Sequence, residues 1–462
     1  MQRTYFDTNR PIVALATVPG ESALAVIRSA GPGAIELAAS FFSRPSALLS
    51  ARNMSLVHGE FVDPTNREAV DEVLAAVFRS PDGPIGEDGV EFYCHGSAAV
   101  VRKALSLLEA AGFAPALRGE FSFRAFLKGK TDLVRAEAVQ ELVRAGSDGA
   151  RAEALHRLEG GLSRALESSR KAVVDALAEA EARLDYAEED DSPAGSLDGA
   201  SLRSLRGFVA RIADTYSAGR LYERGARAVV AGRPNAGKSS LFNLLVREER
   251  SIVAPDPGTT RDWIEAGIEL GGLPLRLIDT AGLREAEGGV EVEGVTRSRR
   301  LAGEAEAVIY VVDGCQGLSP ADAGFLESRS DSLRVWNKVD APGCAPAPPD
   351  FLRFSAATGE GLPALADALR ELIRPSFGLG NPGSPRAAAE GELRIASERQ
   401  KLLLDRAVAA FDACLGGLDA GAPLDALVLD LRDAADALGE ITGEIASEEV
   451  LEAVFSRFCL GK

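Results

Sequence analysis

The sequence predicts a multidomain protein in which an α/β domain is inserted into an all-helical domain that follows an N-terminal α+β domain. The chain has 462 residues, which is more than one domain of ordinary size holds. A phosphate-binding loop lies between an apolar strand and a helix near the middle of the chain. Segments rich in Ala, Leu, Glu and Arg flank this unit on both sides, and such a composition favours helices.

We place the α+β domain at residues 1–120, where short apolar runs are broken by Gly and Pro turns. The helical domain takes residues 121–218 and 377–462, and the α/β domain takes residues 219–376. Ras-like α/β domains have neighbouring chain ends, so one can be inserted without distorting its host. The second helical part contains an apolar stripe at three- and four-residue steps, formed by Leu424, Leu427, Val428, Leu431, Ala435 and Leu438.

The phosphate-binding loop runs from Gly232 to Ser240, after the apolar strand Ala226 to Val230. Its glycines let backbone N–H groups turn inward around phosphate oxygens. Lys238 can reach the β and γ oxygens and so act in catalysis, while the Ser239 hydroxyl can ligate Mg²⁺. The loop therefore predicts a nucleoside triphosphatase of the P-loop class, and its nucleotide contacts are Asn235, Ala236, Gly237, Lys238, Ser239 and Ser240.

Two later motifs predict that the nucleotide is GTP. Asp279 ends an apolar strand and can hold Mg²⁺ through water, while the Gly282 amide meets the γ-phosphate. Asp340 follows another apolar strand and can accept hydrogen bonds from guanine N1 and N2, which adenine does not offer. A buried carboxylate left unpaired by the wrong base is heavily penalised. We assign four further residues to the base site: Asn337, Lys338, Ser355 and Ala356. For Ser355 and Ala356, an ordinary turn without a role in binding is the alternative.

The segment Gly258 to Asp262 has the composition of a switch that orders over the γ-phosphate. We expect Thr259 and Thr260 to contact GTP there, with a threonine hydroxyl, that of Thr260, ligating Mg²⁺. Ras-like enzymes carry a water-orienting glutamine directly after the Asp-x-x-Gly turn, but here that position is Leu283. Another residue must therefore orient the attacking water.

Glu291 is our candidate for orienting the water, Glu293 is its competitor, and an ordinary solvated acid is the alternative. The transition state spreads negative charge over the γ-phosphoryl oxygens, and no arginine finger is evident, so another cation must serve. Asn235 can supply a neutral oxygen to K⁺ at this position, although asparagine also suits a turn.

Composition restricts the remaining possibilities. The formal net charge of −18 disfavours indiscriminate binding to nucleic acid. The segment Arg118 to Arg135 is either a local basic surface suited to RNA or a plain solvated face. No signal sequence or membrane-spanning run is evident, so we expect a soluble cytoplasmic protein with no membrane association. The five cysteines lack metal-ligand spacing and favour free thiols; they are Cys94, Cys315, Cys344, Cys414 and Cys459.

With these motifs in view, the chain resembles the MnmE family of tRNA modification GTPases, also called TrmE, over nearly its whole length. The nucleotide motifs contribute to this resemblance, and distinctive motifs occur in separate regions of the chain. These are Gly86-Glu87-Asp88, His95-Gly96, Arg118-Gly119-Glu120-Phe121, Ile441-Thr442-Gly443-Glu444 and the terminal Cys459-Leu460-Gly461-Lys462.

The resemblance implies an enzyme that works with the flavoprotein MnmG, as a heterotetramer, on C5 of the wobble uridine of certain tRNAs. The group installed would be carboxymethylaminomethyl or aminomethyl. The N-terminal domain would form a homodimer and bind a reduced folate, 5,10-methylenetetrahydrofolate or a compound like 5-formyltetrahydrofolate, as the one-carbon donor. By motif, the folate contacts would be Arg28, Glu87, Lys130 and Lys462.

The resemblance also implies that GTP hydrolysis requires K⁺ and dimerisation of the G domains. Asn235 would contact the K⁺ ion and Glu291 would orient water. Cys459 would lie near the folate and take part in the modification chemistry. Two other functions stay open on the sequence, a ribosome-assembly GTPase and a regulatory GTPase switch, although the split helical domain and the cysteine tail weigh against the first.

Overall fold

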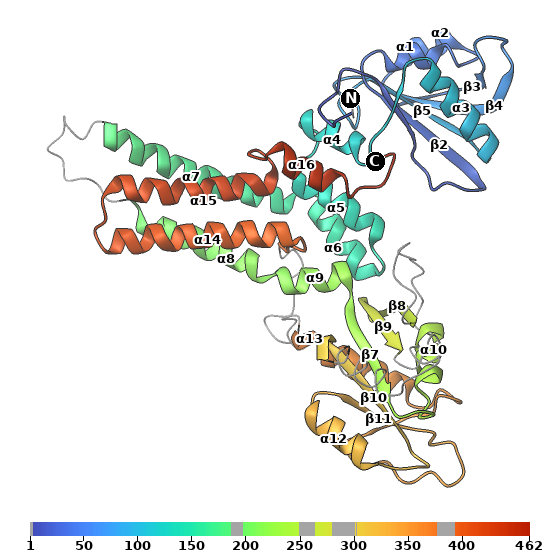
Figure 1. Ribbon diagram of the computed structural model, residues 1–462. Helices are drawn as coiled ribbons and strands as arrows, with labels where there is room; N and C mark the ends of the chain where they lie inside the picture. The colour runs from blue at the N-terminus through green and yellow to red at the C-terminus, as the bar shows by residue number, and fades with distance from the viewer. Residues whose placement is uncertain (1–2, 186–196, 249–263, 280–300, 302, 377–392) are drawn as a thin grey trace. The chain divides into compact units, whose positions relative to one another are not determined.

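The computed structural model describes residues 3–185, 197–248, 264–279, 301, 303–376 and 393–462, and Figure 1 shows their arrangement. Contacts divide the chain into two compact units. The first contains Met1–Gln140 and Thr442–Lys462, and the second contains Glu141–Ile441. The predicted domain boundaries at residues 120, 218 and 376 remain predictions. No helix within the described part of the chain is long and apolar enough to cross a membrane.

A six-stranded sheet forms the body of the first unit, in the order β3-β4-β5-β2-β1-β6. All neighbouring strands are antiparallel except β1 and β6, which are parallel. Valine, isoleucine and phenylalanine are frequent in these strands, as expected for residues that fit a pleated surface. The strands are β1 (Ile12–Leu15), β2 (Ser22–Ala30), β3 (Ser55–Val62), β4 (Ala69–Phe78), β5 (Gly89–Gly96) and β6 (Ala114–Pro115).

One face of this sheet is buried beneath three helices, α1 (Ala34–Ala39), α2 (Pro45–Leu49) and α3 (Ala98–Ala110). Alternate strand residues point to this core, as the two-residue period of a strand requires, and Ile27 and Phe92 are among them. The opposite face carries exposed apolar side chains on β2, β3 and β4.

The C-terminal residues of the chain pack within the first unit. Helices α4 (Glu120–Leu127), α5 (Leu133–Arg144) and α16 (Glu448–Phe455) share an aromatic core in which the ring of Phe123 meets that of Phe455 edge to face. Gly119 begins α4 at φ 70°, and a Cβ atom there would lie 2.4 Å from the carbonyl oxygen of Phe455. Only glycine therefore fits at this close approach.

The second unit contains a six-stranded sheet in the order β12-β11-β10-β7-β9-β8. Every pair is parallel except β8 with β9. Apolar cores lie on both faces, so the central strands are continuous apolar runs. The strands are β7 (Ala226–Gly232), β8 (Ile264–Leu270), β9 (Leu273–Asp279), β10 (Ala307–Asp313), β11 (Leu333–Asn337) and β12 (Leu352–Arg353).

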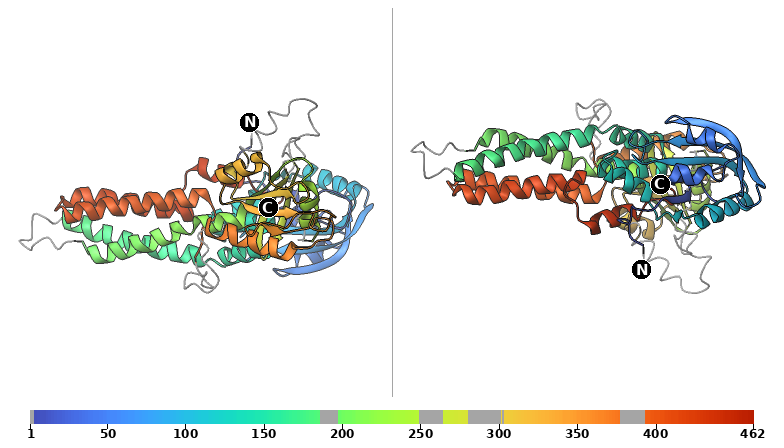
Figure 2. Two further views of the ribbon diagram at one scale, coloured as in Figure 1. Left: turned by 90° about the horizontal axis from the view of Figure 1, so that it is seen from below. Right: turned by 90° about the horizontal axis from the view of Figure 1, so that it is seen from above.

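Long helices form the rest of this unit, and α7, α8, α14 and α15 run alongside one another in Figures 1 and 2. The Arg206 guanidinium joins α8 to α14 by two hydrogen bonds to the Asp412 carboxylate. The apolar stripe predicted in α15 is buried at Leu427, Leu431 and Leu438. The helices are α6 (Asp148–Leu158), α7 (Gly161–Asp185), α8 (Gly199–Asp214), α9 (Tyr216–Arg224), α10 (Lys238–Glu248), α12 (Pro320–Ser328), α13 (Leu362–Ser376), α14 (Glu398–Asp419) and α15 (Leu424–Thr442).

Candidate functional site

The phosphate-binding loop connects β7 to α10, as the sequence predicts. Gly232 ends the strand at φ 141°, and a Cβ atom there would lie 2.2 Å from the carbonyl oxygen of Val311. Asn235 is exposed and adopts φ 61°. The buried Lys238 donates a hydrogen bond of 2.8 Å from Nζ to the carbonyl oxygen of Arg233. The lysine therefore folds back over its own loop, where phosphate oxygens would lie.

Asn337 links the phosphate-binding loop to the two base motifs. Its side chain is 1% exposed. Nδ2 donates a 2.8 Å hydrogen bond to the carbonyl oxygen of Ala236, and Oδ1 accepts a 3.0 Å bond from the Ala356 amide. At Gly237, φ is 97° and an added Cβ would lie 2.1 Å from Asn337 Nδ2. Residue 237 must therefore be glycine to leave room for the Asn337 side chain, in addition to any need to leave room for a phosphate.

Lys338 is held by an aspartate that ends the neighbouring strand. Its Nζ lies 2.7 Å from Oδ2 of Asp313, and Asp313 Oδ1 accepts a 2.9 Å bond from the Cys315 amide. Burial works to raise the pKa of the Asp313 carboxyl, but the hydrogen bonds from Lys338 and from the Cys315 amide outweigh it and hold that pKa below its usual range. The pairing of β10 with β11 sets Asp313 opposite Asn337, so the carboxylate meets the next residue of the motif.

Asp340 is exposed and is oriented by the buried Ser355, whose hydroxyl donates to Asp340 Oδ1 at 2.6 Å. This hydrogen bond holds one of the two carboxylate oxygens of Asp340. The turn around Ser355 also uses its own backbone, because the Gly359 amide donates to the Ser355 carbonyl at 2.9 Å. Since the Ala356 amide already donates to Asn337, a base carbonyl would have to share or take this donor.

Asp279 is 1% exposed and stands at the carboxyl end of β9. The register of the parallel pair β7 and β9 sets it opposite Val230, two residues before the loop begins. Ser239 lies in the first turn of α10 and is exposed. Carboxylate and hydroxyl oxygens are ligands that suit Mg²⁺, so the donor types at this edge of the sheet fit the ion.

Four residues assigned to the site from the sequence lie outside the described residues: Thr259, Thr260, Gly282 and Glu291. Across the described residues, no group of three or more His, Cys, Asp or Glu side chains is arranged to hold a metal ion. Asp279 and Ser239 would therefore need phosphate oxygens, water or residues outside this part of the chain to complete the coordination of Mg²⁺.

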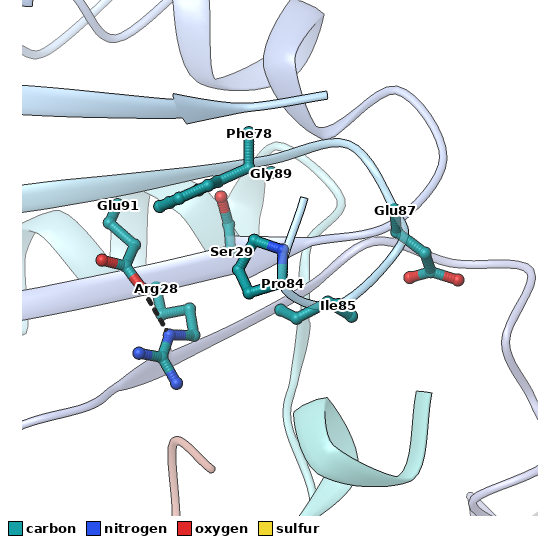
Figure 3. A pocket seen from close by; sticks show the side chains of 8 residues that line it. All are labelled: Arg28, Ser29, Phe78, Pro84, Ile85, Glu87, Gly89 and Glu91. Atoms are coloured by element: carbon teal, nitrogen blue, oxygen red, sulfur yellow. Dashed lines mark hydrogen bonds and ion pairs between the residues drawn. The ribbon is translucent and has the colours of Figure 1, made fainter. Parts of the chain in front are cut away.

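A second group of predicted residues meets in the first unit, around the C-terminal tail. The Arg28 guanidinium donates from Nε to Glu91 Oε1 at 2.6 Å and from Nη1 to the Gly461 carbonyl at 2.9 Å. A small cavity of about 100 Å³ lies beside it, with Arg28 and Glu91 at one end and Glu87 at the other (Figure 3). The cavity is lined by Arg28, Ser29, Phe78, Pro84, Ile85, Glu87, Gly89 and Glu91.

The tail residues are held against the start of the chain. Gly461 adopts φ 83°, and a Cβ atom there would lie 2.5 Å from the Leu15 carbonyl oxygen. Desolvation lowers the pKa of the half-buried Lys462 amine below its usual value. Cys459 is exposed, and its carbonyl oxygen accepts a 3.3 Å bond from the Gly119 amide. Lys130 is exposed and lies beside Gly86, next to the Glu87 end of the cavity.

Comparison with known proteins now adds to this geometry. A family profile described as the MnmE helical domain matches residues 133–459, and one described as the GTP-binding protein TrmE N-terminus matches residues 11–130. A Thermus thermophilus protein named tRNA modification GTPase MnmE is 44% identical over 98% of this chain and 99% of its own length. The chain belongs to the MnmE family. The predicted multidomain fold, an N-terminal α+β domain and a helical domain split by a P-loop α/β domain, is confirmed with it.

Other relatives of the same name resemble this MnmE-family chain over its full length. The one from Treponema denticola is 36% identical over 100% of both chains. The one from Moorella thermoacetica is 38% identical over 98% of this chain and 99% of its own. Among solved structures, the G domain of the T. maritima FeoB iron transporter covers 32% of this chain and 98% of its own at 27% identity, with a TM-score of 0.25, which is too low to support a conclusion.

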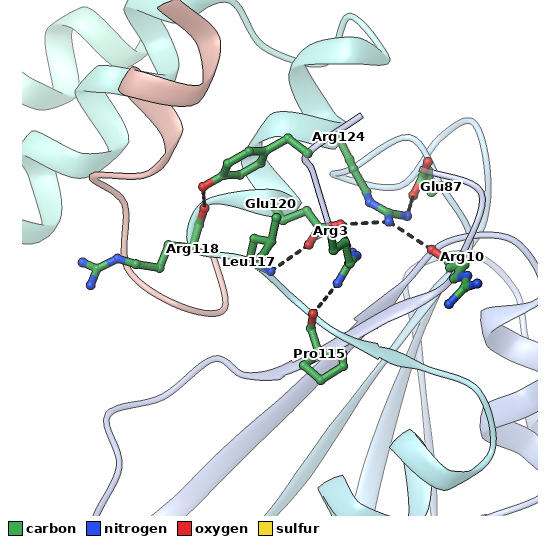
Figure 4. Close-up of polar contacts among 9 residues, drawn as sticks. Arg3, Arg10, Glu87, Pro115, Leu117, Arg118, Glu120 and Arg124 are labelled. Carbon is green, nitrogen blue, oxygen red and sulfur yellow. Dashed lines mark hydrogen bonds and ion pairs between the residues drawn. The ribbon is translucent and has the colours of Figure 1, made fainter. Parts of the chain in front are cut away.

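An ion network beside the tail corrects one expectation for this MnmE-family chain (Figure 4). Arg124 was a member of the possible basic surface from Arg118 to Arg135, but its side chain is fully buried. It donates to Glu87 Oε2 at 3.1 Å, to Glu120 Oε1 at 3.0 Å and to the Arg10 carbonyl at 3.0 Å. Buried charges need such partners. Arg124 therefore supports the Glu87 end of the cavity and is unavailable to RNA.

Sequence reasoning missed three residues that orient the predicted ones: Asp313 beside Lys338, Glu91 beside Arg28, and Arg124 beside Glu87. Asp313 carried a usable signal, because it ends the apolar strand β10 just as Asn337 ends β11. Glu91 carried none, since Arg28 is 63 positions away in the chain. Arg124 carried only a local signal, its i,i+4 spacing from Glu120.

Proposed function

We propose that this chain is a GTP hydrolase that acts in the modification of tRNA, as the names of its relatives describe. The observation that carries the proposal is the bridge made by Asn337 between the phosphate-binding loop and the Ser355 turn. With it, the phosphate motif and the base motif belong to one site, which supports a guanine nucleotide as the ligand. A purified-protein assay tests this: GTP should be hydrolysed, and ATP at the same concentration should not compete with it.

Within this proposal Lys238 and the loop amides of Asn235 to Ser240 bind the phosphates, and Asp340 selects guanine. Mg²⁺ would be held by Ser239, Asp279 and Thr260, and would supply charge stabilisation at the γ-phosphate. The buried position of Asp279 at the carboxyl edge of the sheet supports its part in this set. The role proposed for Glu291 is to orient the attacking water, and the basis of this proposal is the sequence.

We further propose that K⁺ is the cation that substitutes for an arginine finger, with Asn235 as its ligand. The exposed Asn235 side chain on a left-handed residue of the loop supports this role. Asparagine tolerates that backbone conformation better than most residues, so Asn235 can hold it while its side-chain oxygen serves as a ligand to K⁺. Dimerisation of the G domains during turnover is part of the same proposal.

A reduced folate is the proposed one-carbon donor, bound by Arg28, Glu87, Lys130 and Lys462. These side chains suit the carboxylates and the polar ring of such a ligand, and Arg28 lies at the cavity mouth beside the tail. The cavity of about 100 Å³ is smaller than the roughly 300 Å³ or more of typical ligand pockets. Space beyond it is therefore needed for a whole folate, and a second protomer would supply walls for it.

The homodimer proposed for the N-terminal domain is supported by the outer face of its sheet. Leu56 and Leu74 are exposed there on the paired strands β3 and β4, and Leu24 is exposed on β2, beyond β5; exposed apolar side chains gathered on one face mark interaction sites. Burying this face between two copies would also enclose the cavity. Gel filtration with light scattering of the full chain tests it: the proposal expects a dimer that Leu74→Glu dissociates and that Leu402→Glu, on an exposed helix position, leaves intact.

The proposed chemical step on tRNA is made with MnmG at C5 of the wobble uridine, adding an aminomethyl or carboxymethylaminomethyl group. The net charge of −18 supports a division of labour in which the partner supplies much of the tRNA-binding surface. Cys459 is the proposed thiol of this chemistry, and its exposure on the tail near Lys462 supports that. Loss of modification in Cys459→Ser, with GTP hydrolysis retained, would separate this role from a purely regulatory GTPase switch.

A further inference from the structure

Two cysteines that the proposed function does not use lie together beside the base-recognition motif. The Cys315 thiol is exposed, and the Cys344 sulfur lies against Gly314, the residue directly before Cys315. Cys315 follows β10, and Cys344 lies in the loop after Asp340. The two sulfurs are thus contributed by the two loops that also present Asp313 and Lys338.

Backbone contacts fix these two loops to each other. The Ala345 amide donates to the Gly314 carbonyl at 3.0 Å, and the Gly314 amide donates to the Asn337 carbonyl at 2.9 Å. Trp336 Nε1 donates to the Ala345 carbonyl at 2.9 Å. Because the first of these bonds joins the residue before Cys315 to the residue after Cys344, it holds the two cysteines side by side.

The glycine at position 314 makes room for one of the sulfurs. A Cβ atom there would lie 2.5 Å from Cys344 Sγ and 2.7 Å from Trp336 Nε1. Residue 314 must therefore be glycine for the Cys344 sulfur to stay near Cys315. Cys94 and Cys414 are unsuited by comparison, since both are buried and burial raises the pKa of each thiol to about 11.

We propose that Cys315 and Cys344 form a redox-active dithiol whose closure to a disulfide weakens nucleotide binding. In proteins of reducing compartments, such pairs are transient and serve redox sensing. The oxidant is a low-molecular-weight disulfide such as oxidised glutathione. The Cys315 thiolate attacks it and releases one glutathione thiolate; the Cys344 thiolate then attacks the Cys315 sulfur and releases the second. Two electrons pass from the protein to the small disulfide, and each released thiolate takes up a proton.

The coupling to the nucleotide follows from Asp313, and this part rests on the proposed GTP-binding function. The Cys315 amide donates to Asp313 Oδ1, while Asp313 Oδ2 pairs with Lys338. Drawing the Cys315 sulfur into covalent contact with Cys344 moves this amide, so the carboxylate that holds Lys338 loses a hydrogen bond. A bond to a charged acceptor is among the stronger ones, and we expect GDP affinity to fall about tenfold.

The test uses the full chain incubated with oxidised glutathione at pH 8.5, followed by non-reducing peptide mass spectrometry and a fluorescent GDP titration. The mild alkalinity matters because desolvation and the Asp313 carboxylate raise the pKa of the Cys315 thiol, which slows its attack at neutral pH. The proposal expects a peptide pair linked through Cys315 and Cys344, lighter by two hydrogen atoms and separated by dithiothreitol, with weaker GDP binding.

Cys315→Ser and Cys344→Ser should each abolish the link, and Cys459→Ser, which removes another exposed thiol, should leave it in place. A lasting glutathione adduct on Cys315 with Cys344 still free, or a link to Cys459, would overturn the dithiol. A closed disulfide with unchanged GDP affinity would overturn the coupling. Failure of the reduced protein to bind GDP at all would instead refute the proposed GTP-binding function, because the peptide readout does not depend on the nucleotide.

Discussion

The Nδ2 atom of Asn337 lies 2.8 Å from the carbonyl oxygen of Ala236, so a buried amide joins the motif proposed to recognise the base to the loop proposed to hold the phosphates. The same side chain accepts the Ala356 amide. Three segments that are far apart in the chain therefore take their positions from one residue. Because both contacts are made by a side chain that is 1% exposed, water is poorly placed to replace them.

Asn337→Ala should weaken GDP and GTP binding together. The substitution removes two hydrogen bonds and leaves the Ala236 carbonyl and the Ala356 amide without this partner, at a cost of about 2 kcal/mol or about 30-fold in affinity. Isothermal titration calorimetry measures it. Asn66→Ala, at an exposed loop residue of the other unit, is the matched control and should bind as wild type does. Unchanged affinity in Asn337→Ala would remove this residue from the site.

Asp340→Asn should exchange the preferred base from guanine to xanthine. An amide N–H₂ cannot accept from the N2 amino group of guanine, but it can donate to the carbonyl oxygen that xanthine has at that position. We expect GTP affinity to fall by about 100-fold or more and XTP to become the better competitor. Competition against a fluorescent guanine nucleotide measures both. A variant that keeps its preference for GTP would show that Asp340 does not contact the base.

GTP turnover should be much faster in KCl than in NaCl at equal ionic strength, if K⁺ lies against the phosphates. Asn235→Gly supplies a sharp control, because glycine adopts the φ of 61° found here without strain, so the side chain with its oxygen is lost while the loop backbone is kept. We expect this variant to bind GTP normally and to lose the stimulation by K⁺. Equal rates of the wild type in the two salts would contradict the K⁺ assignment.

Arg124→Met should loosen the first unit near the cavity. It removes the buried cation that the carboxylates of Glu87 and Glu120 share and leaves each with one weaker or more exposed partner, Lys128 and Arg3; disrupting a buried ion pair costs about 3 kcal/mol. Since a chain of two units does not unfold in one step, amide hydrogen exchange within α4 is the appropriate measurement. Arg203→Met, which removes an exposed ion pair with Asp419, should change exchange little. Equal exchange in both variants would argue against the network.

The meeting of the phosphate, metal and base motifs at one edge of a sheet was predictable from the sequence, because each motif follows an apolar strand. Parallel strands place their carboxyl ends at one edge of a sheet, so Gly232, Asp279 and Asn337 were bound to meet there. The strand pairings of β7, β9, β10 and β11 bear this out. What the spacing did not reveal was how Asn337 and Asp313 hold their neighbours, because side-chain bridges depend on register and not on motif.

The second group of residues was less accessible to sequence reasoning. Arg28 and Gly461 are 433 positions apart in the chain, and no periodicity connects them. Arg124 was misjudged because it was grouped with the other basic residues of the segment Arg118 to Arg135, although Phe123 and Phe126 flank it in the sequence. Its burial arises from tertiary partners, one of which, Glu87, is 37 positions away. The roles proposed for residues in binding K⁺, in binding folate and in activating water stay predictions.

The central claim, a GTPase that acts in tRNA modification, is tested most directly by mass spectrometry of tRNA nucleosides from cells that lack this protein. The cells are complemented with the wild type or with Asp279→Ala, which removes the buried carboxylate proposed to hold Mg²⁺. The account predicts that the modified wobble uridine is lost and that only the wild type restores it. An unchanged nucleoside profile in the cells lacking the protein would contradict the account and favour a GTPase switch with another target.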